Sequence, residues 1–352
     1  MKDQENSNLP KLTVVTPAYM SLESLLEEYK KENGNLITII LPVFNEIECL
    51  PFVVPEIINY LNTQQQKYFW QLIFVDDCST DNSYQYLSKI AETVYDKVKI
   101  ITFKLSKNSG SHIAISAGLK FSNGDFTIIM ASDGQDPVEV IGELISQWEN
   151  KFDFVIAARK NNLDHNELNL WLSNTAWKLM NWFTKINMPQ GGCDMLGIDK
   201  KVLFAFNKMD ERNTTFIYRL LSLGFDQKVL YYSKKERIAG KSKWTLIKKI
   251  KIIIDVITSH SSRPLRLITK FSLIITFILL LRWLFVIINV FILGGKVTDL
   301  EVILNTIFTT TAFIMMTLSA IGDYIWRILD EARKRPQFEI SKIAGNIQKK
   351  ET

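Results

Sequence analysis

The residues best suited to chemistry lie in a short acidic turn, Ala131 to Pro137, which follows the apolar run Phe126 to Met130. Within this turn, Asp133 and Gln135 present oxygen atoms with one residue between them. Mg²⁺ and Mn²⁺ prefer such oxygen ligands, and a metal ion held there could bridge a diphosphate. The turn alone fits equally well a plain loop in which Asp133 is exposed and Asp136 caps the following helix. The residues at the ends of the other predicted strands distinguish between a metal site and a plain loop.

Polar residues also end the other predicted strands. In a parallel sheet the carboxyl ends of the strands share one edge, and α/β folds bind ligands there. Each polar pair alone could cap a helix or close a turn, but together with the acidic turn they indicate one site, and converging carboxylates favour a metal ion. No G-x-x-x-x-G-K-[ST] loop and no G-x-G-x-x-G fingerprint after the first strand is present. The polar pairs are Asn45-Glu46, Asp76-Asp77 and Lys107-Asn108.

Alternating strands and helices must position these residues. From Leu36 onward, continuous apolar runs alternate with segments of helical pattern, as expected for buried parallel strands with connecting helices. This order predicts an α/β fold around a mostly parallel sheet. The predicted strands are 37–43, 69–75, 98–105, 126–130 and 152–157. The predicted helices include 111–121, 138–150 and one that follows the first strand and ends near residue 63.

Two apolar stretches near the end of the chain predict a membrane hairpin. Phe271 to Leu293 is apolar except for Arg282 and Asn289. Ile303 to Gly322 carries no charged residue. Each stretch is about long enough for a helix to cross the ~30 Å hydrocarbon core of a bilayer, and a pair of buried soluble helices is the alternative. Basic residues flank both outer ends: Arg263, Arg266, Lys270, Arg327, Arg333, Lys334 and Arg335.

The charge pattern and composition also predict a location. By the positive-inside rule, the basic flanks predict that the large N-terminal portion and both termini lie in the cytoplasm, with the hairpin in the cytoplasmic (inner) membrane. The first residues show no signal-peptide pattern. Cys49, Cys78 and Cys193 have no metal or redox spacing and are typical of thiols in a reducing compartment. The net charge of +5 is modest, and we expect no nucleic-acid partner.

Two further segments have compositions typical of helices at a membrane surface. Glu167 to Ile186 contains three tryptophans among mainly apolar residues, and Lys243 to Ser259 places isoleucines on one face and lysines near the other. Packing against the domain's own sheet is the alternative for both. Arg282, near the middle of the first apolar stretch, would cost at least ~2.5 kcal/mol in lipid. It therefore favours contact with a helix, a lipid phosphate or another subunit of a homo-oligomer.

Ordered motifs connect these features with a known family. The chain contains, in this order, VFNE at 43–46, VDDCSTDNS at 75–83, ASDGQDP at 131–137 and RIAGKSKW at 237–244. Together they resemble the motif set of the family 2 glycosyltransferases, and above all the polyprenyl-phosphate sugar transferases. The similarity runs from about residue 36 to residue 340 and includes the tail segment at 321–340. The resemblance implies a GT-A fold and inverting transfer of a sugar to polyprenyl (undecaprenyl or dolichyl) phosphate, with a UDP-sugar favoured as donor and GDP-mannose possible.

The resemblance also implies residue roles and a Mg²⁺ or Mn²⁺ cofactor. Asp76 would read the edge of the base, while Arg237 and Lys243 would clamp the donor diphosphate. A lipid phosphate is already an anion at neutral pH, so the reaction needs positioning and stabilisation of the leaving diphosphate more than a general base. The implied catalytic residues are Asp133, Arg159 and Lys243. The nucleotide sugar would contact Pro42, Phe44, Glu46, Asp76, Asp77, Asp133, Arg237 and Lys243. The acceptor phosphate would contact Arg159 and Ser173, and the metal ion would be bound by Asp133 and Gln135.

The chain departs from the family pattern in places. Ala131 replaces the first acid of the D-x-D motif, and Met195-Leu196-Gly197 replaces the usual Phe-Arg-Leu, which removes an arginine near the acceptor. A degenerate homologue serving as a membrane scaffold is therefore one alternative. A processive polysaccharide synthase is another, but its Q-x-x-R-W motif is absent, because Leu279 stands at the glutamine position before Arg282-Trp283.

These features divide the chain into consecutive parts. Only the first carries no functional prediction. The parts are an N-terminal arm (1–35), a GT-A catalytic domain (36–235), a basic clamp with an interfacial amphipathic helix (236–263), two transmembrane helices (264–326) and a cytoplasmic tail (327–352).

Overall fold

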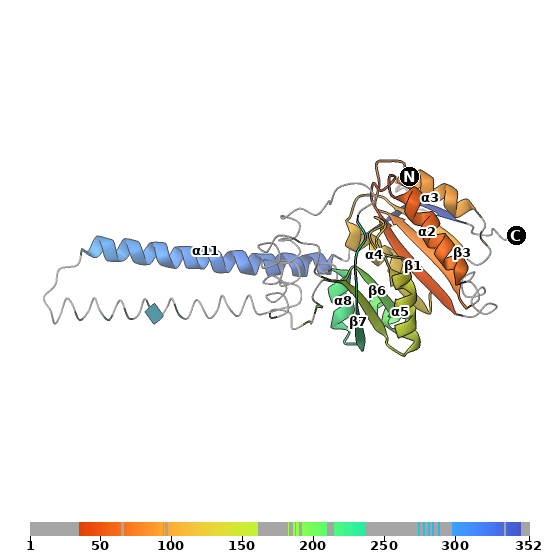
Figure 1. Cartoon of the computed structure of the whole chain (residues 1–352). Helices are drawn as coiled ribbons and strands as arrows, with labels where there is room; N and C mark the ends of the chain where they lie inside the picture. The colour runs from red at the N-terminus through yellow and green to blue at the C-terminus, as the bar shows by residue number, and fades with distance from the viewer. Residues whose placement is uncertain are drawn as a thin grey trace, which may run out of the picture.

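A computed structural model describes residues 35–64, 67–93, 95, 98–160, 182, 186, 188–189, 192–209, 215–236, 274, 277–278, 281, 284, 288, 298–333 and 336–345. These residues form an eight-stranded sheet with the order β7-β5-β6-β4-β1-β2-β3-β8 (Figure 1). The strands are β1 (Leu36–Val43), β2 (Phe69–Asp76), β3 (Val98–Leu105), β4 (Phe126–Ile129), β5 (Phe154–Arg159), β6 (Met195–Asp199), β7 (Gln227–Tyr232) and β8 (Ile340–Gly345). The helices are α2 (Leu50–Thr63), α3 (Ser83–Glu92), α4 (Ser111–Lys120), α5 (Glu139–Glu149), α7 (Lys200–Asn207), α8 (Phe216–Ser222) and α11 (Asp299–Ala332).

The centre of the sheet is parallel. β1 pairs in parallel with β2 and β4, β2 pairs with β3, and β5 pairs with β7. β6 runs antiparallel to β4 and β5, and β8 runs antiparallel to β3. The prediction of an α/β fold around a mostly parallel sheet is confirmed. Because of these directions, the carboxyl ends of β1 to β5 and β7 lie at the same edge as the starts of β6 and β8.

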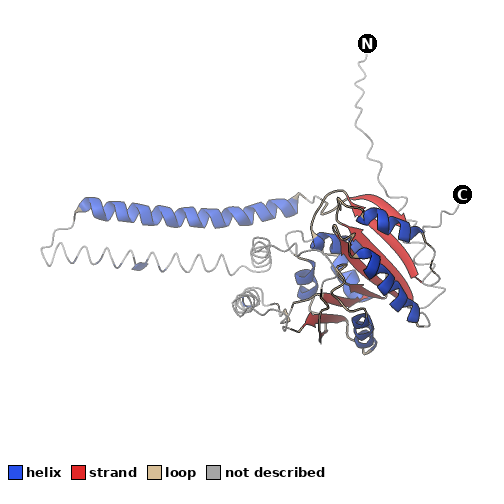
Figure 2. Ribbon diagram, turned by 45° about the horizontal axis from the view of Figure 1, so that its top comes forward, coloured by secondary structure: helices blue, strands red, loops and turns tan. Residues whose placement is uncertain are grey.

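Helices cover both faces of the sheet (Figure 2). Alternate side chains of β1 separate the two layers: Ile37 and Ile39 pack with α2, α3 and α5, whereas Ile40 packs with α4, α7 and α8. Successive residues of a strand point to opposite faces, so apolar residues at nearly every position of β1 serve both layers. Each fully buried side chain of this kind contributes about 1.5–3 kcal/mol, which makes the sheet a firm support for the loops at its edge.

α11 projects from this α/β domain as a single long helix, with its C-terminal end beside the domain (Figure 1). It has 34 residues, which corresponds to about 51 Å of helix. Large apolar side chains along it are exposed, including Ile303, Ile307, Ile314 and Leu318. The predicted stretch Ile303 to Gly322 lies within α11. Among the residues that the structure describes, no helix meets the combined requirement of length and hydropathy for crossing a bilayer.

The sequence predicted the early strands closely and the later ones poorly. β1 to β4 match the predicted segments to within about a residue at each end, while the fifth strand is shifted to Phe154–Arg159. The short strands β6, β7 and β8 and the helices α7 and α8 were not predicted. The N-terminal arm, the segment 243–259, most of 167–186, most of 271–293 and Arg282 lie outside the described residues.

Candidate functional site

Asp76 ends β2 and is fully buried. It lies at the edge of the sheet where the carboxyl ends of the parallel strands meet. Its Oδ2 accepts a hydrogen bond of 3.0 Å from the Ser79 amide and lies 3.7 Å from Nζ of Lys104. Among the described residues, no group donates to its Oδ1. A buried carboxylate oxygen without a hydrogen bond is costly, so Oδ1 is suited to accept an N–H group from a bound ligand.

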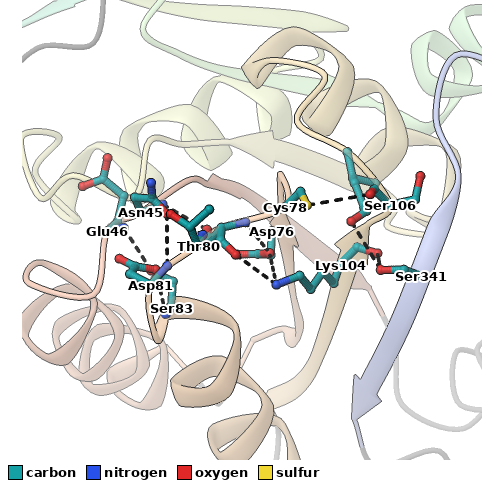
Figure 3. Close-up of polar contacts among 12 residues, drawn as sticks. Asn45, Glu46, Asp76, Cys78, Thr80, Asp81, Ser83, Lys104, Ser106 and Ser341 are labelled. Atoms are coloured by element: carbon teal, nitrogen blue, oxygen red, sulfur yellow. Dashed lines mark hydrogen bonds and ion pairs between the residues drawn. The ribbon is translucent and has the colours of Figure 1, made fainter.

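Lys104 is the next-to-last residue of the neighbouring strand β3, and it holds the same turn from the other side. Its Nζ donates a hydrogen bond of 3.0 Å to the Ser79 carbonyl oxygen and lies 5.3 Å from the centroid of the Tyr84 ring. Figure 3 shows this side chain reaching from β3 toward Asp76. Sequence reasoning missed Lys104, because one lysine near the end of an apolar strand is typical of a solvated strand end.

Asp77 is also buried, but its two oxygens hold a loop. Oδ1 accepts from the Ser109 amide and Oδ2 from the Gly110 amide, both at 2.7 Å. Burial raises the pKa of Asp77, although these two amides oppose the rise. Gly110 has a φ of +91° and precedes the first residue of α4, so Asp77 fixes the start of that helix. These contacts favour an anchoring role over the implied contact with the nucleotide.

The end of β1 is tied to the turn after β2. Asn45 has a φ of +51°, and its side-chain Oδ1 accepts a 2.8 Å hydrogen bond from the Thr80 amide. The backbone amides of Asn45 and Glu46 donate to the hydroxyl groups of Ser79 and Ser83, each at 3.0 Å. This interlock fixes the backbone below Glu46, whose carboxylate points away from Ser83 (Figure 3).

The acidic turn after β4 contains the predicted metal ligands. Asp133 Oδ1 accepts from the Gln135 amide at 3.2 Å, and Gly134 takes a φ of +75° that closes the turn. The Gln135 carbonyl accepts a 2.8 Å hydrogen bond from the amide of Lys235. The part of the chain that the structure describes contains no cluster of three or more His, Cys, Asp or Glu residues with metal-ligand geometry. The carboxylate and amide oxygens of Asp133 and Gln135 nevertheless fit a hard divalent ion that takes its other ligands from a diphosphate and water.

Asp136 does not cap a helix, so that interpretation is wrong. α5 begins after Val138 without a side-chain cap. Instead, Asp136 is 3% exposed, and its Oδ1 accepts a 2.5 Å hydrogen bond from the hydroxyl of Tyr232. Nζ of Lys234 lies 3.4 Å from the same oxygen. The pattern after the strand suggested a cap, because a polar residue before a helix usually is one. Its actual partners lie about a hundred positions later: Tyr232 ends β7, and Lys234 follows that strand.

Lys234 joins this turn to the start of β6. Its Nζ lies 3.3 Å from Asp194 Oδ2 and 3.4 Å from Asp136 Oδ1. Burial alone would lower the pKa of Lys234, but the carboxylates of Asp136, Asp194 and Asp133 outweigh burial and raise it. Burial, followed by the charge of Asp136, raises the pKa of Tyr232. Sequence reasoning missed Asp194, Tyr232 and Lys234.

The remaining predicted residues lie at or beyond this edge. Pro42 accepts through its carbonyl a 2.8 Å hydrogen bond from the Ser132 hydroxyl, and Phe44 is half-buried beside it. Arg159 ends β5, is exposed and pairs in register with Tyr232 on β7. The implied site residues that the structure describes therefore lie along one edge of the sheet. Ser173, Arg237 and Lys243 lie outside the described residues.

Both acidic turns are attached to the end of β1. The Asp77 amide donates to the Val43 carbonyl at 2.8 Å, and the Ser132 hydroxyl donates to the Pro42 carbonyl. The turn after β2 offers a buried acceptor, Asp76 Oδ1, beside Lys104. The turn after β4 offers the oxygen atoms of Asp133 and Gln135 as ligands for a cation. Such an arrangement can bind the base at one turn and a metal-bound diphosphate at the other.

Comparisons with known proteins decide the family. The model of glycosyl transferase family 2 matches residues 38–206. An uncharacterized glycosyltransferase, YkcC, of Bacillus subtilis is 30% identical over 88% of this chain and 94% of its own length. The chain belongs to glycosyl transferase family 2. It is therefore a glycosyltransferase, and the matched range contains the ends of β1 to β5 with both acidic turns.

Two further relatives of this family 2 transferase carry more specific names. An undecaprenyl-phosphate 4-deoxy-4-formamido-L-arabinose transferase of Proteus mirabilis is 30% identical over 89% of this chain and 95% of its own length. A prophage bactoprenol glucosyl transferase homolog of Escherichia coli K12 is 28% identical over 87% of this chain and 99% of its own length. The similarity thus extends over nearly the full length of each relative.

Proposed function

We propose that this family 2 glycosyltransferase transfers a sugar from a nucleotide diphosphate sugar, preferably a UDP-sugar, to polyprenyl phosphate. The acceptor assignment is supported by the names of the Proteus and Escherichia relatives, which align over most of this chain. The donor assignment is supported by the edge of the sheet, where both acidic turns join the end of β1.

The observation that carries the donor assignment is the open Oδ1 of Asp76. This oxygen is buried and has no donor among the described residues, while Oδ2 is already used by Ser79 and Lys104. Uracil presents one N–H between two carbonyl oxygens, which matches one open carboxylate oxygen beside a lysine. Guanine presents two adjacent N–H donors and would use both oxygens of a carboxylate. The site therefore favours uracil, with guanine as the weaker candidate.

The transfer step needs little side-chain chemistry. A phosphate oxygen of the lipid attacks the anomeric carbon from the side opposite the diphosphate, and the bond between that carbon and the diphosphate oxygen breaks. The diphosphate leaves with the bonding electrons, and the configuration is inverted. Mg²⁺ or Mn²⁺ held by Asp133 and Gln135 would supply positive charge to the leaving group. Lys234 lies beside this turn, with Nζ 3.4 Å from Asp136 Oδ1, and its charge opposes the rise that burial causes in the pKa of Asp136.

The same proposal places the chain at the cytoplasmic face of the inner membrane. α11 carries large exposed apolar side chains along its length, which lipid would cover. In this arrangement α11 and the apolar stretch 271–293 form the anchor, and the edge with the two turns faces the lipid phosphate. A homo-oligomer in the membrane belongs to the same proposal, because Arg282 would need a partner there.

A transfer assay with the purified full chain tests this function. Radiolabelled UDP-sugars and GDP-mannose are each incubated with undecaprenyl phosphate and Mn²⁺, and the organic phase is counted. We expect one UDP-sugar to label the lipid and chelation of the metal to stop the reaction. The absence of lipid product with every donor would contradict the proposal. Growing polymer would indicate a processive synthase, and failure to bind any nucleotide would indicate a scaffold.

A further inference from the structure

β8 completes the sheet next to the strand that carries Lys104. It follows α11 after residues 333–339 and pairs antiparallel with β3. Ile340 and Ile343 pack with the same core cluster as Phe103 and Leu105 of β3. At its far end, Gly345 takes a φ of +152°, and a Cβ there would lie 2.8 Å from the Ile100 carbonyl oxygen. The strand is thus fitted closely to β3, and it spares β3 an exposed edge.

The pairing contains a bulge at the point where it reaches the site. Lys104 lies opposite Lys342 and Leu105 lies opposite Ile340, so Ser341 is the extra residue of β8. Its hydroxyl lies 3.0 Å from the Lys104 carbonyl and 3.3 Å from the Leu105 carbonyl, and it donates to this pair. A bulge leaves backbone groups unpaired and redirects the neighbouring side chains. Here one serine hydroxyl replaces the missing ladder bonds.

The residues held by β8 are those that contact the turn after β2. Lys104 donates from Nζ to the Ser79 carbonyl and lies 3.7 Å from Asp76 Oδ2. The next contact lies two residues on, where the Ser106 amide donates to the Glu339 carbonyl at 2.9 Å. Figure 3 shows this continuous line of contacts from Ser341 through Lys104 to Asp76.

We propose that Ser341 is a positioning residue for the donor nucleotide, acting through the bulge on Lys104 and thereby on Asp76. The hydroxyl fixes the backbone from which Lys104 projects, and Lys104 keeps Oδ2 of Asp76 occupied while Oδ1 faces the base. The chain after α11 therefore takes part in donor binding. This inference rests on the proposed function in one respect, the assignment of the nucleotide to Asp76.

The first experiment measures the UDP dissociation constant of the full chain by calorimetry in detergent with Mn²⁺. We expect Ser341→Ala to weaken binding about threefold to tenfold, the range that corresponds to one lost hydrogen bond. Ser341→Thr keeps the hydroxyl and should restore affinity. Ser222→Ala is the matched control. Ser222 ends α8, and its hydroxyl also donates to a backbone carbonyl, that of Arg219. Unchanged affinity in Ser341→Ala, or equal losses in both alanine variants, would overturn the inference.

A double-mutant cycle separates positioning from general support. Lys104→Ala should weaken UDP binding, and adding Ser341→Ala to it should have little further effect, since the hydroxyl acts through Lys104. Equal fold-changes for Ser341→Ala in both backgrounds would overturn the inference while leaving the donor site in place. A wild-type chain that binds no UDP would instead overturn the donor assignment of the proposed function.

Discussion

The two acidic turns at the edge of the sheet divide their carboxylates in the same way. After β2, Asp76 keeps one buried oxygen without a donor among the described residues, while Asp77 holds the Ser109 and Gly110 amides. After β4, Asp133 stays partly accessible, while Asp136 is buried against side chains of the β7 segment. In each turn one aspartate is available for a ligand and the other builds the loop.

The turns differ in what the building aspartate contacts. Asp77 uses the backbone amides of Ser109 and Gly110, and every residue except proline has such an amide. Asp136 depends on two particular side chains, Tyr232 and Lys234, which lie beyond the family-matched range 38–206. In the first turn, the aspartate that builds the loop therefore finds its partners within the matched range 38–206. The second turn requires residues 232–234, which lead into the predicted basic clamp, and this links the turn that carries Asp133 and Gln135 to that segment.

Loss of the accessible acid in the second turn should have the largest effect on catalysis. We expect Asp133→Ala to lower kcat/KM about 1,000-fold, or ~4 kcal/mol of transition-state stabilisation, because the metal loses its carboxylate ligand. The melting temperature should stay within about 2 °C of wild type, since Asp133 is only half-buried. Transfer assays and thermal melts of the same preparation measure both. Undiminished transfer would remove Asp133 from the mechanism.

The building acid of the same turn should instead affect stability. Asp136→Ala leaves Lys234 buried beside Asp194 alone, and we expect a loss of about 3 kcal/mol in the free energy of unfolding. The matched control is Lys201→Ala, which breaks the surface ion pair with Asp153 and should cost under about 1 kcal/mol. Denaturant titrations compare the two. Equal losses would mean that Asp136 is no more important to the fold than a surface pair.

A pH effect should distinguish the loop that Asp77 anchors. His112, the second residue of α4, lies against the Phe216 ring, and burial lowers its pKa from 6.5 to about 4. Between these values the unfolded chain binds a proton that the native chain does not, so stability falls as the pH falls. At pH 5 the loss should be about 2 kcal/mol relative to pH 7.

His112→Gln tests this directly. Denaturant titrations between pH 7 and pH 5 should show a flatter slope for the variant than for wild type, while its stability relative to wild type improves as the pH falls. An unchanged slope would assign the pH dependence to other groups.

The smallest expected effect separates the two acids of the first turn. Asp76→Asn should weaken UDP binding about tenfold, because the charged acceptor for the base is lost. Asp77→Asn should lower the melting temperature by several degrees, with less effect on UDP affinity, because it disturbs the amides of Ser109 and Gly110. Calorimetry and thermal melts of both variants make the test. A reversed result would exchange the two roles.

The sequence was a good guide where burial on both faces of the sheet leaves a continuous apolar run. β1, β2 and β4 are such runs, and the acidic turns that follow β2 and β4 were predicted at the correct edge. β7 (QKVLYY) and β8 (ISKIAG) lie at the two sides of the sheet, and their short sequences mix polar and apolar residues without a clear alternation, so their strand patterns are weak. The residues that they bring to the site could not be placed without the fold.

The choice between a ligand-binding and a loop-building aspartate also lay beyond the sequence. Asp136 looked like a helix cap because its partners are distant in the chain, and Asp77 looked like part of a nucleotide motif because it is adjacent to Asp76. Lys104 and Lys234 carry no local signal, since a lysine near a strand end is usually solvated. Only pairing across the sheet shows that each lies beside a buried carboxylate.

Hydrogen exchange of the full chain with and without UDP and Mn²⁺ tests the central claim most directly, namely that both turns form one donor site. The account predicts slower exchange in peptides covering 76–80 and 131–136 together, with the second effect lost when Mn²⁺ is omitted. The hollow lined by Trp148, Asp153, Asp199 and Lys201 at the opposite edge should not change. Protection at that hollow, or at neither turn, would contradict the account.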